Sequence, residues 1–277
     1  MKKCGDTLAA RPRSESAHQS TGSAEPQGAH SPEAPEAITT EEIASGAARV
    51  SQTALQAAGV RAAEVHEMAH LHPIADLFAE VWGRNDEGVP MPTEVLRSIA
   101  HAGGLISAVY DVNSAALLGA AVLGRDEPGS SYGYIAAARP GAGDRGIGYA
   151  LKQHQRAWCL ARGITRMRWT FDPLVSRNAR FNLSKLGAVV DHYELAFYGQ
   201  MSDAINGSDP ADRLVADWRL DGQRAIAAGQ GTLSQPTTPA TSTAAVSTPA
   251  NESEPADSDA AGPDGGLAFL RSGAEAW

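Results

Sequence analysis

The stretch Arg145-Gly-Ile-Gly-Tyr-Ala-Leu151 decides how this chain is interpreted. It follows a strand-like run, residues 132–138, and precedes an amphipathic run that ends at Gly163. Glycines at positions 146 and 148 let the backbone turn tightly and approach a ligand closely, and the helix that begins there offers free N–H groups. The stretch therefore predicts an anion site. A strand-to-helix turn needs glycines even without a ligand, so a purely structural turn stays open as an alternative.

Apolar residues are unevenly spread over the 277 residues of the chain. Residues 1–40 and 231–266 are poor in large aliphatic side chains and rich in Ser, Pro and Ala. Such segments do not bury enough apolar surface to offset the entropy of ordering them. We expect a disordered N-terminal segment over residues 1–58, one folded domain over residues 59–222, and a disordered acidic tail over residues 223–277.

Charge and cysteine content exclude several classes of protein. The formal net charge is −9 and the isoelectric point is about 5.4, so no nucleic-acid partner is expected, because backbone phosphates require a basic surface. The two cysteines, Cys4 and Cys159, lie in the N-terminal segment and in a predicted helix, which implies no disulfide framework. No apolar run is long enough for a membrane span or a secretory signal. We expect a cytoplasmic protein with no membrane partner.

Hydrophobic periodicity predicts a mixed α/β domain with the element order βααβββαβαββ. The expected strands are residues 60–68, 105–110, 115–123, 132–138, 165–171, 188–197 and 213–220. The expected helices are residues 71–82, a segment through 95–99, the run 147–161, and residues 178–186. In the third helix, Lys152, Gln153, Gln155 and Arg156 form a polar face, and His154 lies on the apolar face as an expected core residue.

Motifs on both sides of the glycine turn resemble one known family. They are Tyr134-Ile-Ala-Ala-Ala-Arg-Pro140, Arg145-Gly-Ile-Gly148, Asn178 and Lys185-Leu-Gly187. The chain resembles the Gcn5-related N-acetyltransferase (GNAT) superfamily, and is most similar to an uncharacterised bacterial branch of it. The resemblance covers nearly all of residues 60–220. It implies an α/β (α+β) fold with a mixed, strongly curved sheet and helices on both faces.

The resemblance also implies acetyl-CoA, or another short acyl-CoA, as cosubstrate, and no metal. In that family, the backbone of a bulged fourth strand holds the thioester carbonyl, the glycine turn holds the pyrophosphate, and an Asn contacts the pantetheine arm. The matching positions here are Ala137, Ala138, Arg139, Asp144, Arg145, Gly146, Ile147, Gly148 and Asn178. Two structural alternatives stay open: the alanines of this strand only pack against bulky neighbours, and Asn178 only caps its helix.

The turn departs from the family pattern at its first position. Gly143 stands where the family has Arg or Gln, which removes one cationic contact to the pyrophosphate. Arg139 and Arg145 are the candidates to supply that charge instead.

A second departure concerns the general acid. Leu183 stands where many family members place a Tyr that protonates the departing coenzyme A thiolate. Tyr198 and Tyr134 are candidates for this role, and both are equally explained as structural residues of the sheet.

Charged residues on the fifth predicted strand require a partner or a function, because a central strand covered on both faces is usually apolar. Arg168 and Asp172 lie in line there. Either they border the acceptor pocket, with Asp172 orienting or deprotonating an amine, or they form a structural pair that braces the turn at Pro173. His192 and Glu194 on the sixth strand either approach the acceptor or are solvated.

The segment His66-Glu-Met-Ala-His70 matches the H-E-x-x-H zinc pattern. That pattern requires both histidines one turn apart on a single helix, with a third ligand further on. We expect His66 in a strand and His70 at the start of a helix. No metal is therefore expected, and metal-dependent hydrolysis is the third functional alternative.

The sequence thus favours an N-acyltransferase that moves an acetyl group from acetyl-CoA to a small-molecule amine by direct attack in a ternary complex. Asp172 and Tyr198 are its candidate catalytic residues. The alternative is a GNAT-fold module that binds coenzyme A or acyl-CoA without turnover, which Gly143 and Leu183 favour. We expect a monomer, or a homodimer formed through an exposed edge of the last strand, residues 213–220.

Overall fold

The computed structural model describes residues 38–83, 88–142, 145–199 and 211–234. The helices are α1 (Thr40–Ala58), α2 (Met68–Trp82), α3 (Thr93–His101), α4 (Ile147–Leu160), α5 (Ser176–Ala179), the π-helix η2 (Arg180–Lys185) and α6 (Gln223–Gly229). The strands are β1 (Val60–Glu64), β2 (Leu105–Asp111), β3 (Leu117–Arg125), β4 (Ser130–Ala138), β5 (Arg166–Phe171), β6 (Val189–Glu194) and β7 (Arg213–Arg219). Among these helices, none is both long enough and apolar enough to cross a membrane.

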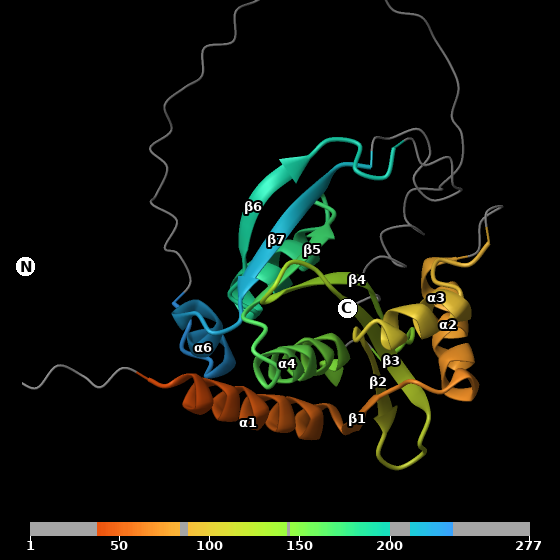
Figure 1. The fold of residues 1–277 in the computed structure, drawn as a ribbon, viewed down its shortest axis with the longest axis horizontal. Helices are drawn as coiled ribbons and strands as arrows, with labels where there is room; N and C mark the ends of the chain where they lie inside the picture. The colour runs from red at the N-terminus through yellow and green to blue at the C-terminus, as the bar shows by residue number, and fades with distance from the viewer. Residues whose placement is uncertain (1–37, 84–87, 143–144, 200–210, 235–277) are drawn as a thin grey trace, which may run out of the picture. The chain divides into compact units, whose positions relative to one another are not determined.

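The seven strands form one mixed sheet in the order β1-β2-β3-β4-β5-β7-β6 (Figure 1). All neighbouring strands are antiparallel except β4 and β5, which are parallel. Because β7 pairs with β5 on one side and with β6 on the other, the prediction of an exposed edge at residues 213–220 is wrong. The edge strand at this end of the sheet is β6.

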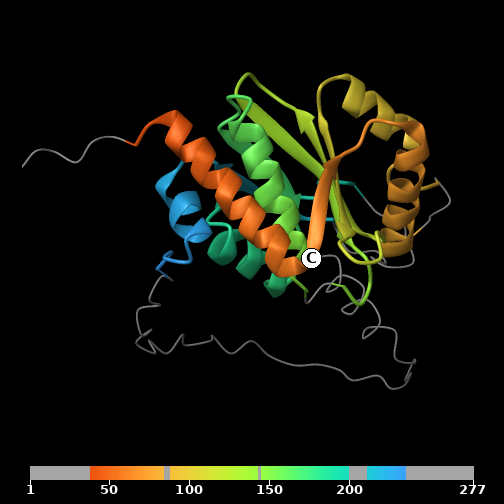
Figure 2. The same cartoon turned by 90° about the horizontal axis from the view of Figure 1, so that it is seen from below.

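Helices cover both faces of the sheet, as the sequence predicted (Figure 2). On one face, α2 and α3 pack on β2, β3 and β4 through a core that contains Leu71, Phe78 and Ile106. On the other face, α4 packs on the same strands through Ile147 and Leu151, and α1 lies across α4. The α4 side therefore has an additional helical layer.

The folded part begins before the expected boundary at residue 59. Helix α1 starts with a capping box between Thr39 and Glu42, and ends at Gly59 in the left-handed conformation. Its buried face consists of small residues, Ala47, Ser51, Ala54 and Ala58. The prediction of disorder over residues 1–58 is therefore wrong for residues 40–58, because a stripe of alanines and a serine gives a weak hydrophobic pattern.

The C-terminal boundary also differs from the expected one. Helix α6 extends the folded part beyond residue 222, so the predicted tail over residues 223–277 is wrong for residues 223–229. Helix α6 contacts α1, η2 and β7. The remaining parts of the two predicted disordered segments, residues 1–37 and 235–277, lie outside the described residues.

The predicted polar face of α4 is buried. Lys152, Gln153, Gln155 and Arg156 are each at most 3% exposed, because α4 is packed between the sheet and α1. The Lys152 side chain lies against Trp169 and Met167 of β5. The Arg156 guanidinium donates from Nε to the Leu220 carbonyl oxygen at 2.8 Å. His154, which the sequence placed in the core, is partly buried, with its Nδ1 at 2.7 Å from Ser107 Oγ.

Candidate active site

Strands β4 and β5 separate after a short parallel pairing, and we call the opening between them the fork. Their pairing runs only from Ser130↔Arg166 to Tyr132↔Arg168. Strand β4 then continues along β3 to Ala138, whereas β5 pairs with β7 to Phe171. From residue 133 onward, the β4 backbone groups that face the fork are therefore not used by the β4–β5 ladder. Such groups are hydrogen-bond donors and acceptors for a ligand that enters the fork.

A β-bulge in β4 accompanies this separation, which confirms the bulge expected in this strand. The register with β3 passes from Val122↔Ile135 to Leu123↔Gly133, so Tyr134 is the additional residue. Beyond the bulge, Ala136, Ala137 and Ala138 are buried, with Ala137 on the α2 side and the other two on the α4 side. Their small side chains serve as core contacts, so any contact of these residues with a ligand in the fork is made by the backbone.

The turn between β4 and α4 ends at Gly146, which has φ of 83° and is the N-cap of α4. This left-handed conformation favours glycine, and a Cβ there would meet no described atom within 4 Å. No side chain caps the helix, and Ile147 and Gly148 are buried. The first N–H groups of α4 therefore remain as donors for an anion. Asp144 and Gly143 lie outside the described residues.

Both arginines that were candidates to replace the missing cationic contact are engaged elsewhere. Arg139 binds Glu80 of α2, with Nη1 to Oε2 at 2.7 Å, and donates from Nε to the Leu117 carbonyl at 3.1 Å. Arg145 binds Asp111 at 2.9 Å and also donates to the Ala58 carbonyl at 2.9 Å. The backbone N–H of Ser114 donates a hydrogen bond to the Asp111 carboxylate, and the Arg145 guanidinium donates a second one. These two contacts, the first the larger, lower the pKa of Asp111 to about 2.

Asn178 does not cap the short helix, so the capping interpretation is wrong. The N-cap of α5 is Val175, and Asn178 is the third residue of the helix. Its Oδ1 is buried and has no hydrogen-bond partner among the described residues. Because an unsatisfied buried amide oxygen costs free energy, this atom fits an N–H donor from a ligand, such as an amide of a pantetheine arm.

Arg168 and Asp172 do not pair, which corrects one of the two interpretations of β5. Arg168 donates to Asp126 Oδ2, from Nε at 3.2 Å and also from Nη2. Its neighbour Arg166 forms a bidentate pair with Asp217, at 2.7 and 3.0 Å. Asp172 instead accepts from the Leu174 N–H at 2.8 Å and so fixes the turn after β5. The second Asp172 carboxylate oxygen is not part of this contact.

Three tyrosines lie close together near the point where β4 leaves β5, and we call Tyr132, Tyr134 and Tyr198 the tyrosine cluster. The rings of Tyr132 and Tyr134 meet edge to face, with centroids 5.4 Å apart. Burial is the main cause that raises the pKa of Tyr132, and the proximity of Tyr198 and Tyr134 raises it further. A hydrogen bond with Thr170 acts in the opposite direction and lowers this pKa. Tyr132 is not among the site residues predicted from the sequence. The only feature that marks it as a site residue is its position where β4 separates from β5.

Tyr198 lies beyond the end of β6 and is 52% exposed. Its ring contacts Phe197 edge to face at 4.7 Å, and the Arg213 guanidinium lies 5.1 Å from its centroid. Nearby, Tyr193 donates its hydroxyl to Asp212, whose charge, together with that of Asp172, helps to raise the Tyr193 pKa. The structure therefore places Asp172, just after β5, near Tyr193 of β6.

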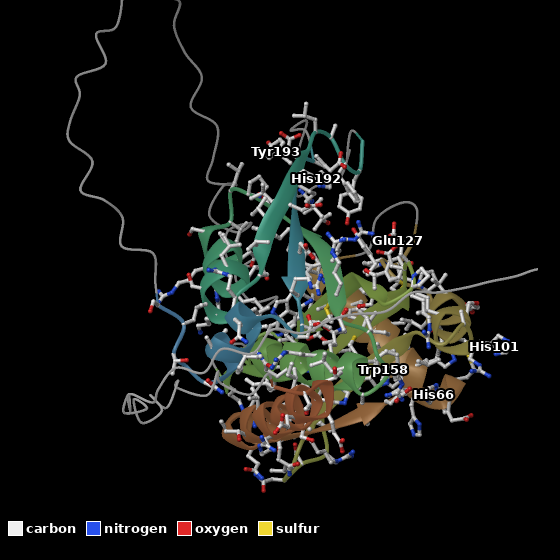
Figure 3. All side chains as sticks on the ribbon, turned by 60° about the vertical axis from the view of Figure 1, so that its left-hand side comes forward. His66, His101, Glu127, Trp158, His192 and Tyr193 are labelled. Atoms are coloured by element: carbon white, nitrogen blue, oxygen red, sulfur yellow. The ribbon has the colours of Figure 1, made fainter. Side chains whose placement is uncertain are left out.

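His192 and Glu194 interact with each other on the exposed strand β6. Figure 3 shows His192 next to Tyr193 on this strand. The His192 ring lies between Glu194, at 2.9 Å, and Asp191, at 3.0 Å, and these two hydrogen bonds raise its pKa. These contacts accord with the solvated interpretation.

Comparisons with known proteins concern the fold. No family model and no curated protein matches the sequence. Solved structures with a similar arrangement include the ribosomal-protein-S18-alanine N-acetyltransferase of Escherichia coli (13% identity, TM-score 0.48, 58% of this chain and 94% of that one). Others are the IAA acetyltransferase of Bacillus cereus (16%, 0.44, 57% and 98%) and an N-acetyltransferase of Staphylococcus aureus (13%, 0.48, 58% and 98%).

The arrangement of this chain's own strands decides the architecture. A seven-stranded mixed sheet contains one parallel pair, β4–β5, which separates at a bulge and leads through a glycine turn into α4. This is the GNAT-like arrangement that the sequence predicted. Strands β1 to β7 lie within the expected domain of residues 59–222, whereas α1 and α6 lie outside it.

Beneath the fork of this GNAT-like fold lies a buried amine, which sequence reasoning placed on a solvent face. The Lys152 ammonium lies 3.8 Å from the centroid of the Trp169 ring, and 3.9 Å from Met167 Sδ. A Cβ built on Gly133, at the start of the unpaired part of β4, would lie 3.7 Å from Lys152 Nζ. Burial lowers the pKa of Lys152 from its ordinary 10.5 to about 7.

The histidines of the H-E-x-x-H segment do not share a helix. His66 follows β1 and lies 3.3 Å from Glu64, which also accepts from Trp158 Nε1 at 3.0 Å (Figure 3). His70 lies within α2, and Glu67 is the N-cap of that helix. Over the described ranges, no group of three or more His, Cys, Asp or Glu side chains is arranged to hold a metal ion.

Proposed function

We propose that this chain is an acyl-CoA-dependent N-acyltransferase that moves an acetyl group to a small-molecule amine. The observation that supports this most strongly is the continuity of the fork with the glycine turn. A single extended ligand that lies along the unpaired part of β4 reaches the first N–H groups of α4 at Gly146. One end of such a ligand meets backbone donors suited to a carbonyl oxygen, and its other end meets donors suited to a phosphate.

In this proposal, most of the catalytic effect comes from orientation. Acyl-CoA supplies the activated thioester when bound. The β4 backbone after the bulge binds and orients it, and Asn178 Oδ1 accepts an amide N–H of the pantetheine arm. The first turn of α4 binds the pyrophosphate. Ala137 and Ala138 contribute through their backbone, because their side chains are buried on opposite faces of the sheet.

The acceptor amine enters from the tyrosine cluster side. Asp172 has one carboxylate oxygen outside the turn contact with Leu174 and is our candidate to take the amine proton. Tyr198 is our candidate to donate a proton to the leaving thiolate, because it is an exposed tyrosine that lies near Tyr132.

A second candidate function is binding of coenzyme A or acyl-CoA without turnover. It is favoured by the engagement of Arg139 with Glu80 and of Arg145 with Asp111, together with Leu183 at the position of the family's general acid. Neither arginine compensates for Gly143 in this arrangement. Both functions require that the chain binds acyl-CoA. Only the first includes transfer of the acyl group, so a measurement of turnover distinguishes the two.

Binding is tested by calorimetric titration of the full chain with acetyl-CoA. Gly146→Asp places a carboxylate at the start of α4, where it repels a phosphate, and we expect binding to be lost. Gly163→Asp is the matched control, because Gly163 also has positive φ (72°), no described atom within 4 Å of a built Cβ, and a place beyond the other end of α4. No heat with wild-type protein at millimolar acetyl-CoA would refute the proposal.

Turnover is tested by release of the free thiol in the presence of a panel of small amines. We expect Asp172→Asn and Tyr198→Phe each to reduce the rate by about 100-fold or more while acetyl-CoA binding stays unchanged. Binding without thiol release for any amine would favour the second function. Full activity in both variants would refute the roles given to Asp172 and Tyr198.

A further inference from the structure

An open cavity of about 410 Å³ lies on the α4 side of the molecule, next to the glycine turn. Three elements form it: α1, the start of α4 and the end of α6. Its lining includes Arg49, Ala57, Arg145, Gly146, Tyr149 and Gln230. Both α1 and α6 lie outside the expected domain of residues 59–222, so the added helices create this cavity.

The chemistry of the cavity fits an anion attached to a flat ring. Arg49 brings an exposed guanidinium from α1, and Arg145 brings a second one, already paired with Asp111. The half-buried Tyr149 offers an aromatic ring, and Gln230 offers an amide with a donor and an acceptor. A volume of about 410 Å³ lies within the usual range of pockets for small ligands and cofactors.

The cavity and the turn share Arg145 and Gly146. Gly146 lines the cavity and is also the N-cap of α4, where the proposed function places the pyrophosphate. A ligand held at the first N–H groups of α4 therefore has the cavity directly beside its phosphates. The part of coenzyme A that follows the pyrophosphate is a 3′-phosphorylated adenosine, which combines an anion with a flat ring.

We propose that this cavity binds the 3′-phosphorylated adenosine end of coenzyme A, with Arg49 of α1 contacting the 3′-phosphate. This inference rests on the proposed function. It gives α1 a role in ligand binding in addition to its packing on α4. The same chemistry is present in free adenosine 3′,5′-bisphosphate, so the test includes that compound as a separate ligand.

The test compares two ligands that differ by one phosphate. The full chain, wild type and Arg49→Ala, is titrated by calorimetry with coenzyme A and with 3′-dephospho-coenzyme A. We expect Arg49→Ala to weaken coenzyme A binding about tenfold, as the loss of one charge-assisted contact does, and to leave dephospho-coenzyme A binding unchanged. Arg97→Ala, an exposed arginine of α3 on the other face of the sheet, is the matched control and should change neither.

A second variant fills the cavity. Ala57 is exposed on α1 and lines the cavity, so Ala57→Trp occupies the space without disturbing the buried face of the helix. We expect it to weaken both ligands, because the adenosine of each enters the same space. Unchanged binding of coenzyme A in both Arg49→Ala and Ala57→Trp would overturn this inference while the proposed function stands.

The remaining outcomes separate the two proposals. If no coenzyme A derivative binds to wild-type protein but adenosine 3′,5′-bisphosphate binds in an Arg49-dependent manner, the proposed function falls and the cavity is a site for a separate nucleotide. If neither class of ligand binds, both proposals fall. Equal weakening of coenzyme A and dephospho-coenzyme A by Arg49→Ala would overturn the contact with the 3′-phosphate.

Discussion

Replacement of Lys152 by Met should change how stability depends on pH. Lys152 is 3% exposed beneath the fork, and burial lowers its pKa from 10.5 to about 7. The unfolded chain therefore binds more protons than the folded chain between pH 7 and 10.5, so the free energy of unfolding of wild-type protein rises with pH in this window. Below pH 7, the lysine is protonated in both states and contributes no further pH dependence.

The magnitude follows from these pKa values. Each pKa unit corresponds to about 1.4 kcal/mol, so the fall from 10.5 to about 7 represents about 5 kcal/mol, of which about 3 kcal/mol appears between pH 7 and pH 9.5. The Trp169 ring, 3.8 Å from the ammonium, stabilises the charged form by about 2 kcal/mol at most. Desolvation of a fully buried ammonium costs more than that, so burial decides the direction.

Denaturant unfolding followed by circular dichroism at several values between pH 7 and pH 9.5 measures this effect. We expect the stability advantage of Lys152→Met over wild type to shrink by about 3 kcal/mol across the range. Burial raises the pKa of the nearby Cys159 thiol to about 12 in the folded protein, so it does not ionise there in this range, and its ionisation in the unfolded chain is common to wild type and Lys152→Met. The matched control is Lys185→Met, since Lys185 is exposed in η2. A constant difference between wild type and Lys152→Met would refute the reasoning.

Two further predictions concern packing and charge. Ala54→Leu on the buried face of α1 should reduce the free energy of unfolding by about 1–3 kcal/mol through overpacking against α4, whereas Ala48→Leu on the exposed face of the same helix should have little effect. Equal unfolding midpoints for the two variants would contradict the docking of α1. Asp126→Asn should cost about 1 kcal/mol at neutral pH by removing the partner of Arg168. Because Arg168 lowers the Asp126 pKa below its ordinary 3.8, this contribution is present above pH 3.8 and is lost as the pH falls, so the two unfolding curves should converge in acid.

Local sequence signals predicted the elements that depend on local chemistry. The alternation in residues 165–171 and the apolar spacing in α2 and α4 correspond to a strand and two helices. The bulge in β4 was expected from the family resemblance and not from a local pattern. Local sequence signals did not predict ion pairs between residues that are far apart in the chain. The partner of Arg168 is Asp126, 42 residues away, whereas the nearer Asp172 is used by the turn that follows β5.

The same limit explains why α1 was missed. Its buried face is made of alanines and a serine, which carry little hydrophobic signal but permit close packing of α1 on α4. Once α1 is in place, the polar residues of α4 are covered, so Gln153 and Arg156 become interior residues. A helix face that looks solvated in isolation is thus buried by a segment about 100 positions earlier in the chain. No periodicity within α4 contains that information.

Arg145 shows how the added helix affects the electrostatics of the turn. In the motif, Arg145 is the residue next to the glycines of the turn, yet its guanidinium binds Asp111 and the carbonyls at the end of α1. The depressed Asp111 pKa, about 2, keeps that carboxylate charged, so this pairing persists at neutral pH. The helix that engages Arg145 also brings Arg49 to the cavity beside Gly146. If the cavity binds as we infer, α1 replaces the cationic contact that is absent at Gly143, and removal of Arg49 should weaken coenzyme A binding more than removal of Arg139.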